Sequence, residues 1–314
     1  MNIQQIDYIL AINDLRSFGK AAEHCHVTQP TLSTMVGRLE EEFGVQIFDR
    51  RTKPLSVTKE GEQIIRQLRM ISREIGSLHH LVSQLRGEES GVTLTIGVIP
   101  TVAPYLLPHF LVEFVRAHPQ HHFVCSEMTT DAIIDGLESR ELDVGILSLP
   151  IDNPELREVP LYNEPFLLLD KEVPRAQRRE YIALSDIDLD RLWLLEEGHC
   201  MRNQVEKICG LRDKQGLDRN LDYQSGTIDT LLKFVDRYSG LTLLPLLATR
   251  SLSTKDRRYL RQFQPPIPVR TIGLLVHNHF SKHHLLARLK EAIAASVNQF
   301  FPANNAIDVV DPLG

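Results

Sequence analysis

Two cysteines nine residues apart could carry redox chemistry in this sequence. They are Cys200 and Cys209, at the two ends of the stretch CMRNQVEKIC. The residues between them favour a short helix over 201–208. The positive end of that helix and the nearby cation of Arg202, with His199 also beside Cys200, favour the thiolate, which is the form that peroxides oxidise.

A disulfide between these two cysteines would change the local fold. Residues nine apart on a helix are separated by about 13.5 Å of rise and about 180° of rotation. A disulfide needs Cα atoms no more than about 7 Å apart, so the helix would have to unwind. Spacing alone leaves a second interpretation open, in which both cysteines are small buried hydrophobic residues.

Composition indicates an ordinary soluble protein. With 314 residues, of which 42% are hydrophobic and 24% charged, the chain is long enough for two or three domains. We expect a cytoplasmic location and no membrane contact, because neither a signal peptide nor a long apolar run is indicated. Four cysteines are too few for a disulfide scaffold, so a disulfide in a reducing compartment would be transient or regulatory.

The charge is distributed unevenly. The net charge of −6 argues against a protein that coats nucleic acid without preference. Residues 1–86 carry 11 Lys and Arg against 10 Asp and Glu, whereas the remainder carries 24 against 31. The N-terminal part is therefore the less acidic one.

The first 43 residues predict three helices. Apolar spacing indicates a helix over residues 3–15, and Ser17 and Thr28 would cap two further helices, the last of which ends near Phe43. A short turn before a helix with a polar start is typical of a helix-turn-helix, whose second helix enters the DNA major groove. An exposed polar helix start is the alternative. The predicted DNA contacts on this helix are Thr28, Gln29, Pro30, Thr31, Ser33, Thr34 and Arg38.

Residues 44–58 predict two short strands around a basic tip, which is a winged arrangement. Arg50, Arg51 and Lys53 at the tip suit contact with phosphates or the minor groove. From residue 58 to residue 86 an apolar stripe without proline predicts one long helix that needs a partner, and a polar hinge follows it.

Four stretches closely resemble the DNA-binding module of LysR-type transcriptional regulators. They are FGKAA at 18–22, VTQPTLS at 27–33, LEEEFGVQIFDR at 39–50 and LSVTKEG at 55–61. Three later stretches are similar to the OxyR branch of that family, the peroxide-sensing activators. These are IGVIPTVAPYLLP at 96–108, EGHCMRNQ at 197–204 and GLTLLP at 240–245.

The resemblance implies an α/β fold: an N-terminal winged helix-turn-helix plus a long linker helix, then a two-lobed, periplasmic-binding-protein-like effector domain. The expected parts are 1–58 for DNA binding, 59–91 for the dimerisation or linker helix and hinge, 92–165 with 269–300 for lobe I, 166–268 for lobe II with the redox cysteines, and 301–314 for a C-terminal tail. Alternating strands and helices in lobe I predict a mostly parallel sheet, with a single helix over residues 104–117.

The resemblance also implies a mechanism. Cys200 and Cys209 fall at the positions of the redox pair of the OxyR branch, so that peroxide would oxidise Cys200 to a sulfenic acid and Cys209 would close a disulfide. Thr101 and Thr130 match hydroxyls that line the peroxide pocket, and His199 and Arg202 match residues beside the reactive cysteine. Asp131 stands where relatives have histidine, and a carboxylate there would disfavour the thiolate.

The resemblance implies several partners and no enzymatic activity. We expect promoter DNA of oxidative-stress genes, hydrogen peroxide as signal, homodimers and homotetramers, RNA polymerase, and a thiol reductant of the glutaredoxin or thioredoxin type for reset. No cofactor, catalytic residue or metal is expected, since adjacent histidines such as His79 and His80 diverge on a helix. The alternatives are a LysR-type regulator of a metabolite bound between the lobes, a thiol peroxidase, and a nonspecific nucleoid protein.

Overall fold

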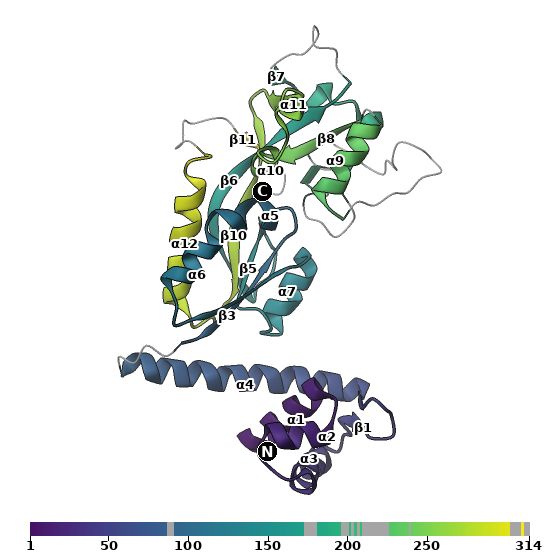
Figure 1. Cartoon of the computed structure of the whole chain (residues 1–314), viewed down its shortest axis with the longest axis vertical. Helices are drawn as coiled ribbons and strands as arrows, with labels where there is room; N and C mark the ends of the chain where they lie inside the picture. The colour runs from purple at the N-terminus through teal and green to yellow at the C-terminus, as the bar shows by residue number, and fades with distance from the viewer. Residues whose placement is uncertain are drawn as a thin grey trace. The chain divides into compact units, whose positions relative to one another are not determined.

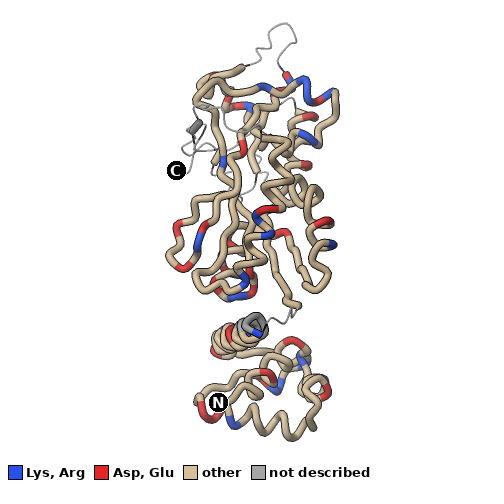
Figure 2. The backbone as a smooth tube through the Cα atoms, turned by 90° about the vertical axis from the view of Figure 1, so that its left-hand side faces the viewer, with Lys and Arg blue, Asp and Glu red and all other residues tan. Residues whose placement is uncertain are grey.

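The computed structural model describes residues 1–86, 91–172, 181–195, 201, 204, 205, 208, 226–238, 240–301, 309 and 310 (Figure 1). Its contacts divide the chain mainly into an N-terminal unit, Met1–Ser90, and an effector unit from Gly91 onward (Figure 2). The N-terminal unit has one hydrophobic core, and the effector unit has two. No helix among the described residues is long and apolar enough to cross a membrane.

The N-terminal unit confirms the predicted helices and wing strands. Its elements are α1 (Ile3–Leu15), α2 (Phe18–His24), α3 (Gln29–Phe43), β1 (Phe48–Asp49), β2 (Ser56–Val57) and α4 (Lys59–Leu85). Ser17 and Thr28 cap α2 and α3 as expected, because each side-chain oxygen accepts a hydrogen bond from a backbone N–H three residues on. Pro30 lies in the first turn of α3, where a missing N–H costs little.

Helix α4 leaves part of its apolar stripe exposed in this chain. Near its start, Ile65 and Leu68 are buried in the core of the N-terminal unit. Further along, Ile71, Leu78 and Val82 keep 38%, 58% and 37% of their surface exposed. Exposed apolar side chains in a row on a long helix favour association with another chain.

Two lobes make up the effector unit, and two long strands join them (Figure 1). In lobe I, β3 (Thr93–Val98) lies parallel to both β4 (His122–Glu127) and β5 (Val144–Leu149). The crossing strands β6 (Leu156–Asp170) and β10 (Ile267–His277) pair antiparallel with each other, and β10 also pairs antiparallel with β5. The parallel part that the sequence predicts is therefore confirmed, and the crossing strands make the sheet mixed.

Lobe II is built on the far end of β6. Residues Phe166–Asp170 of β6 pair antiparallel with β8 (Leu241–Pro245), and Leu168–Leu169 also pair with β9 (Leu260–Phe263). Lobe II also contains β7 (Tyr181–Ile182), the 3-10 turns η3 (Leu184–Asp186) and η4 (Leu189–Arg191), α9 (Ile228–Arg237), α10 (Leu246–Thr249) and α11 (Thr254–Arg257). Short β11 (Val309–Val310) pairs with the start of β10.

The single helix predicted over residues 104–117 is wrong. The structure has α5 (Ala103–Leu106), a 3-10 turn η1 (Leu107–His109) and α6 (Leu111–Ala117) in its place. Pro108 lacks a backbone N–H and its ring crowds the preceding turn, which interrupts an α-helix. Helices α7 (Thr130–Glu138) and α12 (His283–Val297) complete lobe I.

Candidate functional site

The polar start of α3 is open to solvent in the N-terminal unit. Of the residues predicted to contact DNA, Gln29, Thr31, Thr34 and Arg38 are exposed and Ser33 is half-buried. Thr28 is also exposed, and its hydroxyl is already used, since it accepts from the backbone N–H of Thr31. The helix thus presents a row of short polar side chains, which suits hydrogen bonding to base edges.

Arg50 has partners within the N-terminal unit. Its guanidinium donates to Glu40 Oε2 at 2.9 Å and to Ser33 Oγ at 3.0 Å, and it lies 4.9 Å from the ring centre of Phe18. Arg51 also has a partner, since its Nε donates to Asp49 Oδ1 at 3.2 Å, but its side chain is 91% exposed, and Lys53 is also exposed. Of the three predicted wing cations, Arg51 and Lys53 are therefore better placed to reach phosphates than Arg50.

Glu40 ties the recognition helix α3 to the wing, and our sequence reasoning missed it. Its buried carboxylate accepts backbone N–H groups of Ile47 at 2.8 Å and Phe48 at 3.2 Å, in addition to the Arg50 contact. A signal was present in the sequence. Glu40 follows the buried residues Leu32 and Val36 at a spacing of four, so it lies on the apolar face of α3, where an unpaired carboxylate would be costly.

Replacing Glu40 by alanine should lower the free energy of unfolding of the N-terminal unit by about 2–5 kcal/mol, because two buried N–H groups lose their acceptor. Hydrogen exchange at the amides of Ile47 and Phe48 measures the loss. The matched control is Glu41→Ala, on the exposed face of the same helix. Equal effects of the two substitutions would contradict this role of Glu40.

In the effector unit, three polar residues belong to neighbouring parallel strands. Thr101 follows β3, Thr130 begins the helix after β4, and Ser148 lies near the end of β5. All three are buried. The carboxyl ends of parallel strands meet at one edge of a sheet, and that edge is where ligands of α/β proteins bind.

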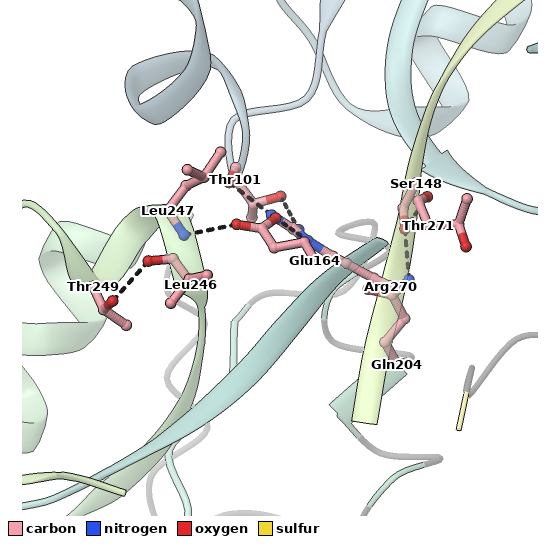
Figure 3. A network of polar contacts seen from close by, with 9 residues as sticks. All are labelled: Thr101, Ser148, Glu164, Gln204, Leu246, Leu247, Thr249, Arg270 and Thr271. Atoms are coloured by element: carbon pink, nitrogen blue, oxygen red, sulfur yellow. Dashed lines mark hydrogen bonds and ion pairs between the residues drawn. The ribbon is translucent and has the colours of Figure 1, made fainter. Parts of the chain in front are cut away.

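A buried arginine connects this edge to lobe II (Figure 3). Arg270 of β10 donates to Thr101 Oγ1 at 3.0 Å and to the Thr101 carbonyl oxygen at 3.2 Å. Its Nε and Nη2 lie 2.9 and 2.8 Å from Glu164 Oε2 on β6. The other carboxylate oxygen of Glu164 accepts the backbone N–H of Leu247 in lobe II at 2.8 Å.

Burial makes this network strongly coupled. Arg270 and Glu164 are each 1% exposed, so each charge depends on the other for its stability. Sequence reasoning assigned no role to either residue. The available signal was a charged residue within or beside an apolar run, in IPVRTIGLLVH for Arg270 and in EPFLLL for Glu164.

The segment between the two predicted redox cysteines is described at four residues. Met201, Gln204, Val205 and Ile208 are helical, in agreement with the helix predicted over 201–208. Their spacing places them on one face, and Met201 and Val205 are buried in the core of lobe II. Gln204 Nε2 donates to Ser148 Oγ at 2.7 Å, so this helical face contacts the strand edge of lobe I.

Two buried oxygens around this edge have no hydrogen-bond partner among the described residues. They are Thr130 Oγ1 and Gln204 Oε1. Leaving a buried polar atom unpaired costs free energy, and a small polar molecule that donates a hydrogen bond would remove that cost. Thr101 Oγ1 accepts from Arg270, which leaves the Thr101 hydroxyl hydrogen for another acceptor.

Comparisons with known proteins agree with this architecture. Residues 3–62 match the model of the bacterial regulatory helix-turn-helix proteins of the lysR family, and residues 86–297 match the LysR substrate binding domain. The chain is 35% identical over 301 residues to the DNA-binding transcriptional dual regulator OxyR of Escherichia coli K12, covering 96% of this chain and 97% of that protein.

This chain belongs to the LysR family, in its OxyR branch.

Other relatives of this LysR-family chain carry similar names. The hydrogen peroxide-inducible genes activator of Dickeya chrysanthemi is 36% identical over 275 residues, or 88% of this chain and 89% of that one. A full-length OxyR variant from Pseudomonas aeruginosa superposes with a TM-score of 0.73 at 30% identity, covering 94% of this chain and 98% of that one. These relatives are regulators, and this protein is likewise a regulator rather than an enzyme.

Several predicted site residues of this LysR-family chain lie outside the described residues. They are His199, Cys200, Arg202 and Cys209.

Asp131 is described and exposed in the first turn of α7, where a carboxylate is favourable beside the helix N-terminus. The part of the chain that the structure describes holds no cluster of three metal-ligating side chains.

The two described cysteines differ from a reactive thiol. Burial, followed by the charge of Asp7, raises the pKa of Cys25. Burial, followed by the charge of Glu127, raises the pKa of Cys125 in the same way. A raised pKa leaves less thiolate at neutral pH, so both thiols should react slowly with peroxide.

Proposed function

We propose that this regulator activates oxidative-stress genes in response to hydrogen peroxide, through Cys200 and Cys209. One observation carries the proposal. The helical face between the two cysteines contacts, through Gln204, the strand edge that holds Thr101 and Thr130. The names of several relatives, which are hydrogen peroxide-inducible genes activators, support the same signal.

In the proposed chemistry, the Cys200 thiolate attacks one peroxide oxygen and the O–O bond breaks. Hydroxide leaves and takes a proton to become water, and Cys200 becomes a sulfenic acid. The Cys209 thiol then attacks the Cys200 sulfur, releasing a second water and forming the disulfide. One peroxide is thus reduced to two waters while two thiols become one disulfide.

Four further residues support the reaction in this proposal. The Thr101 hydroxyl donates to peroxide, because its oxygen already accepts from Arg270. The buried Thr130 hydroxyl provides a second contact. Arg202 and His199 favour the thiolate, and exposed Asp131 opposes it only weakly because solvent screens its charge.

The proposed partners follow from the same model. The N-terminal unit binds promoter DNA in the cytoplasm, and α4 pairs two chains through its exposed apolar residues, with homotetramers built from these dimers. A glutaredoxin- or thioredoxin-type reductant reduces the disulfide back to two thiols. RNA polymerase is contacted by the activated regulator at the promoter. In this proposal the DNA-binding domain, the linker helix with its hinge, the two lobes and the C-terminal tail are divided at residues 58, 91, 165, 268 and 300.

Peptide mapping of the full-length protein tests the proposed chemistry. The protein is treated with one to a few equivalents of hydrogen peroxide, free thiols are blocked, and the digest is analysed by mass spectrometry. We expect a peptide that joins Cys200 to Cys209 at low peroxide dose. Free thiols at both positions, with no sulfenic acid on Cys200, would instead favour a regulator that senses a metabolite between the lobes.

Replacing Arg51 by alanine should weaken promoter binding and reduce the slope of log affinity against log salt by about 1, because one phosphate contact is lost. Fluorescence anisotropy over a salt series measures the slope. The control is Lys255→Ala, an exposed cation of the effector unit. A slope that Arg51→Ala leaves unchanged would remove Arg51 from the DNA interface.

A further inference from the structure

Ser148 and Gln204 form a fully buried polar pair between two lobes of the effector unit. Both residues are 0% exposed, and the distance from Gln204 Nε2 to Ser148 Oγ is 2.7 Å. Ser148 Oγ also lies 3.4 Å from the Thr271 carbonyl oxygen, to which it donates (Figure 3). The serine hydroxyl therefore accepts from the glutamine while its own hydrogen points to β10.

Gln204 is the polar position on an otherwise apolar helical face. Met201 and Val205 are each 2% exposed and pack in the core of lobe II, and Ile208 packs against the same core. The side-chain amide of Gln204 lies against the sheet of lobe I, where its N–H donates a hydrogen bond to the Ser148 hydroxyl. A residue without an acceptor at position 148 would leave this N–H buried and unpaired.

We propose that Ser148 is a positioning residue for the cysteine segment, and that its hydroxyl favours the dithiol form over the disulfide. This inference rests on the proposed function. In a helix, Met201 and Ile208 are separated by about 10.5 Å of rise, whereas a disulfide between the flanking cysteines requires Cα atoms no more than about 7 Å apart. Closing the disulfide unwinds this helix and withdraws Gln204 from Ser148.

The direction of the effect follows from which state has the hydrogen bond. The bond between Gln204 and Ser148 stabilises the dithiol form and is lost in the disulfide. Removing the hydroxyl therefore destabilises the dithiol form and shifts the equilibrium towards the disulfide. We expect Ser148→Ala to raise the equilibrium constant for disulfide formation about tenfold, which corresponds to about 30 mV towards more negative reduction potential for a two-electron couple.

The test equilibrates the full-length protein in graded ratios of glutathione and glutathione disulfide, which accepts the two electrons of the cysteine pair. Free thiols are trapped, and mass spectrometry gives the fraction of the Cys200–Cys209 disulfide. Ser148→Ala should shift the midpoint as stated. Ser251→Ala is the matched control, because among the described residues the Ser251 hydroxyl donates to the nearby carbonyl oxygen of Ala248, and this substitution should leave the midpoint unchanged.

A double-mutant cycle with Gln204→Met shows whether the effect passes through the glutamine. In the Gln204→Met background, Ser148→Ala should have no further effect on the midpoint. A shift that persists there would overturn the inference, since Ser148 would then act through another group. The inference would also be overturned if wild-type protein forms the disulfide and the single substitution Ser148→Ala leaves the midpoint unchanged.

Hydrogen exchange of the fully reduced protein supplies a measurement that needs no disulfide. Amides of residues 201–208 should exchange about tenfold faster in Ser148→Ala than in wild type, and Ser251→Ala should match wild type. Unchanged exchange would overturn the inference while leaving the proposed function intact. Wild-type protein that forms no Cys200–Cys209 disulfide at any glutathione ratio or peroxide dose would overturn both.

Discussion

Replacing Arg270 by methionine should lower the free energy of unfolding of the effector unit by about 3–5 kcal/mol. The substitution leaves the carboxylate of Glu164 buried without its cation, and Thr101 loses the donor to its hydroxyl and carbonyl oxygens. Urea unfolding followed by fluorescence measures the loss, because Trp193, the single tryptophan of the chain, packs against the core of lobe II.

Two further variants separate the charge effect from simple loss of a side chain. Adding Glu164→Gln to Arg270→Met should recover part of the lost stability, because the buried carboxylate is then neutral. Arg288→Met is the exposed control, since Arg288 is 54% exposed and its ion pair among the described residues is with Glu291 on its own helix, and its effect should stay within about 0.5 kcal/mol. A loss below about 1 kcal/mol for Arg270→Met would contradict the coupled network.

Replacing Cys200 by serine should abolish induction of target promoters by hydrogen peroxide. A serine hydroxyl forms neither a thiolate at neutral pH nor a disulfide, so the first step of the proposed chemistry is lost completely. A promoter–reporter fusion in cells treated with peroxide measures induction, which should fall to the level of untreated cells. The same variant should yield no cross-linked peptide after peroxide treatment.

The matched control is Cys125→Ser. Burial and the charge of Glu127 raise the pKa of Cys125, so this residue stays mainly in the thiol form, which reacts slowly with peroxide. Induction by peroxide should therefore be retained in Cys125→Ser. Cys209→Ser should differ from both, because Cys200 can still be oxidised and should accumulate as a sulfenic acid. If Cys200→Ser leaves promoter induction by peroxide unchanged, the redox mechanism is contradicted and a metabolite signal is favoured.

Local sequence was sufficient for the N-terminal unit. Ser17 and Thr28 cap their helices through contacts only three residues away, and the turn between α2 and α3 is equally local. Such features depend on neighbouring residues, so they can be predicted from the chain alone. The strands β3 and β5 of lobe I were also predictable, because a buried parallel strand is a short apolar run bounded by turns.

The single helix expected over residues 104–117 shows where local reasoning fails. Apolar spacing continues through this stretch and favours one helix, whereas Pro108 allows the chain to turn between α5 and α6. A proline inside a helical pattern can kink the helix or end it. The packing of the surrounding lobe decides between these outcomes.

The chain's own residues determined the family, the helix-turn-helix and the position of the cysteine pair along the sequence. Only the tertiary structure decided which polar groups meet. Arg270 binds Glu164 across 106 residues and Thr101 across 169, and Gln204 reaches Ser148 across 56. Buried polar groups bind whichever partner the packing brings within hydrogen-bond distance. Contacts between residues so far apart in the sequence therefore cannot be predicted from local residue spacing.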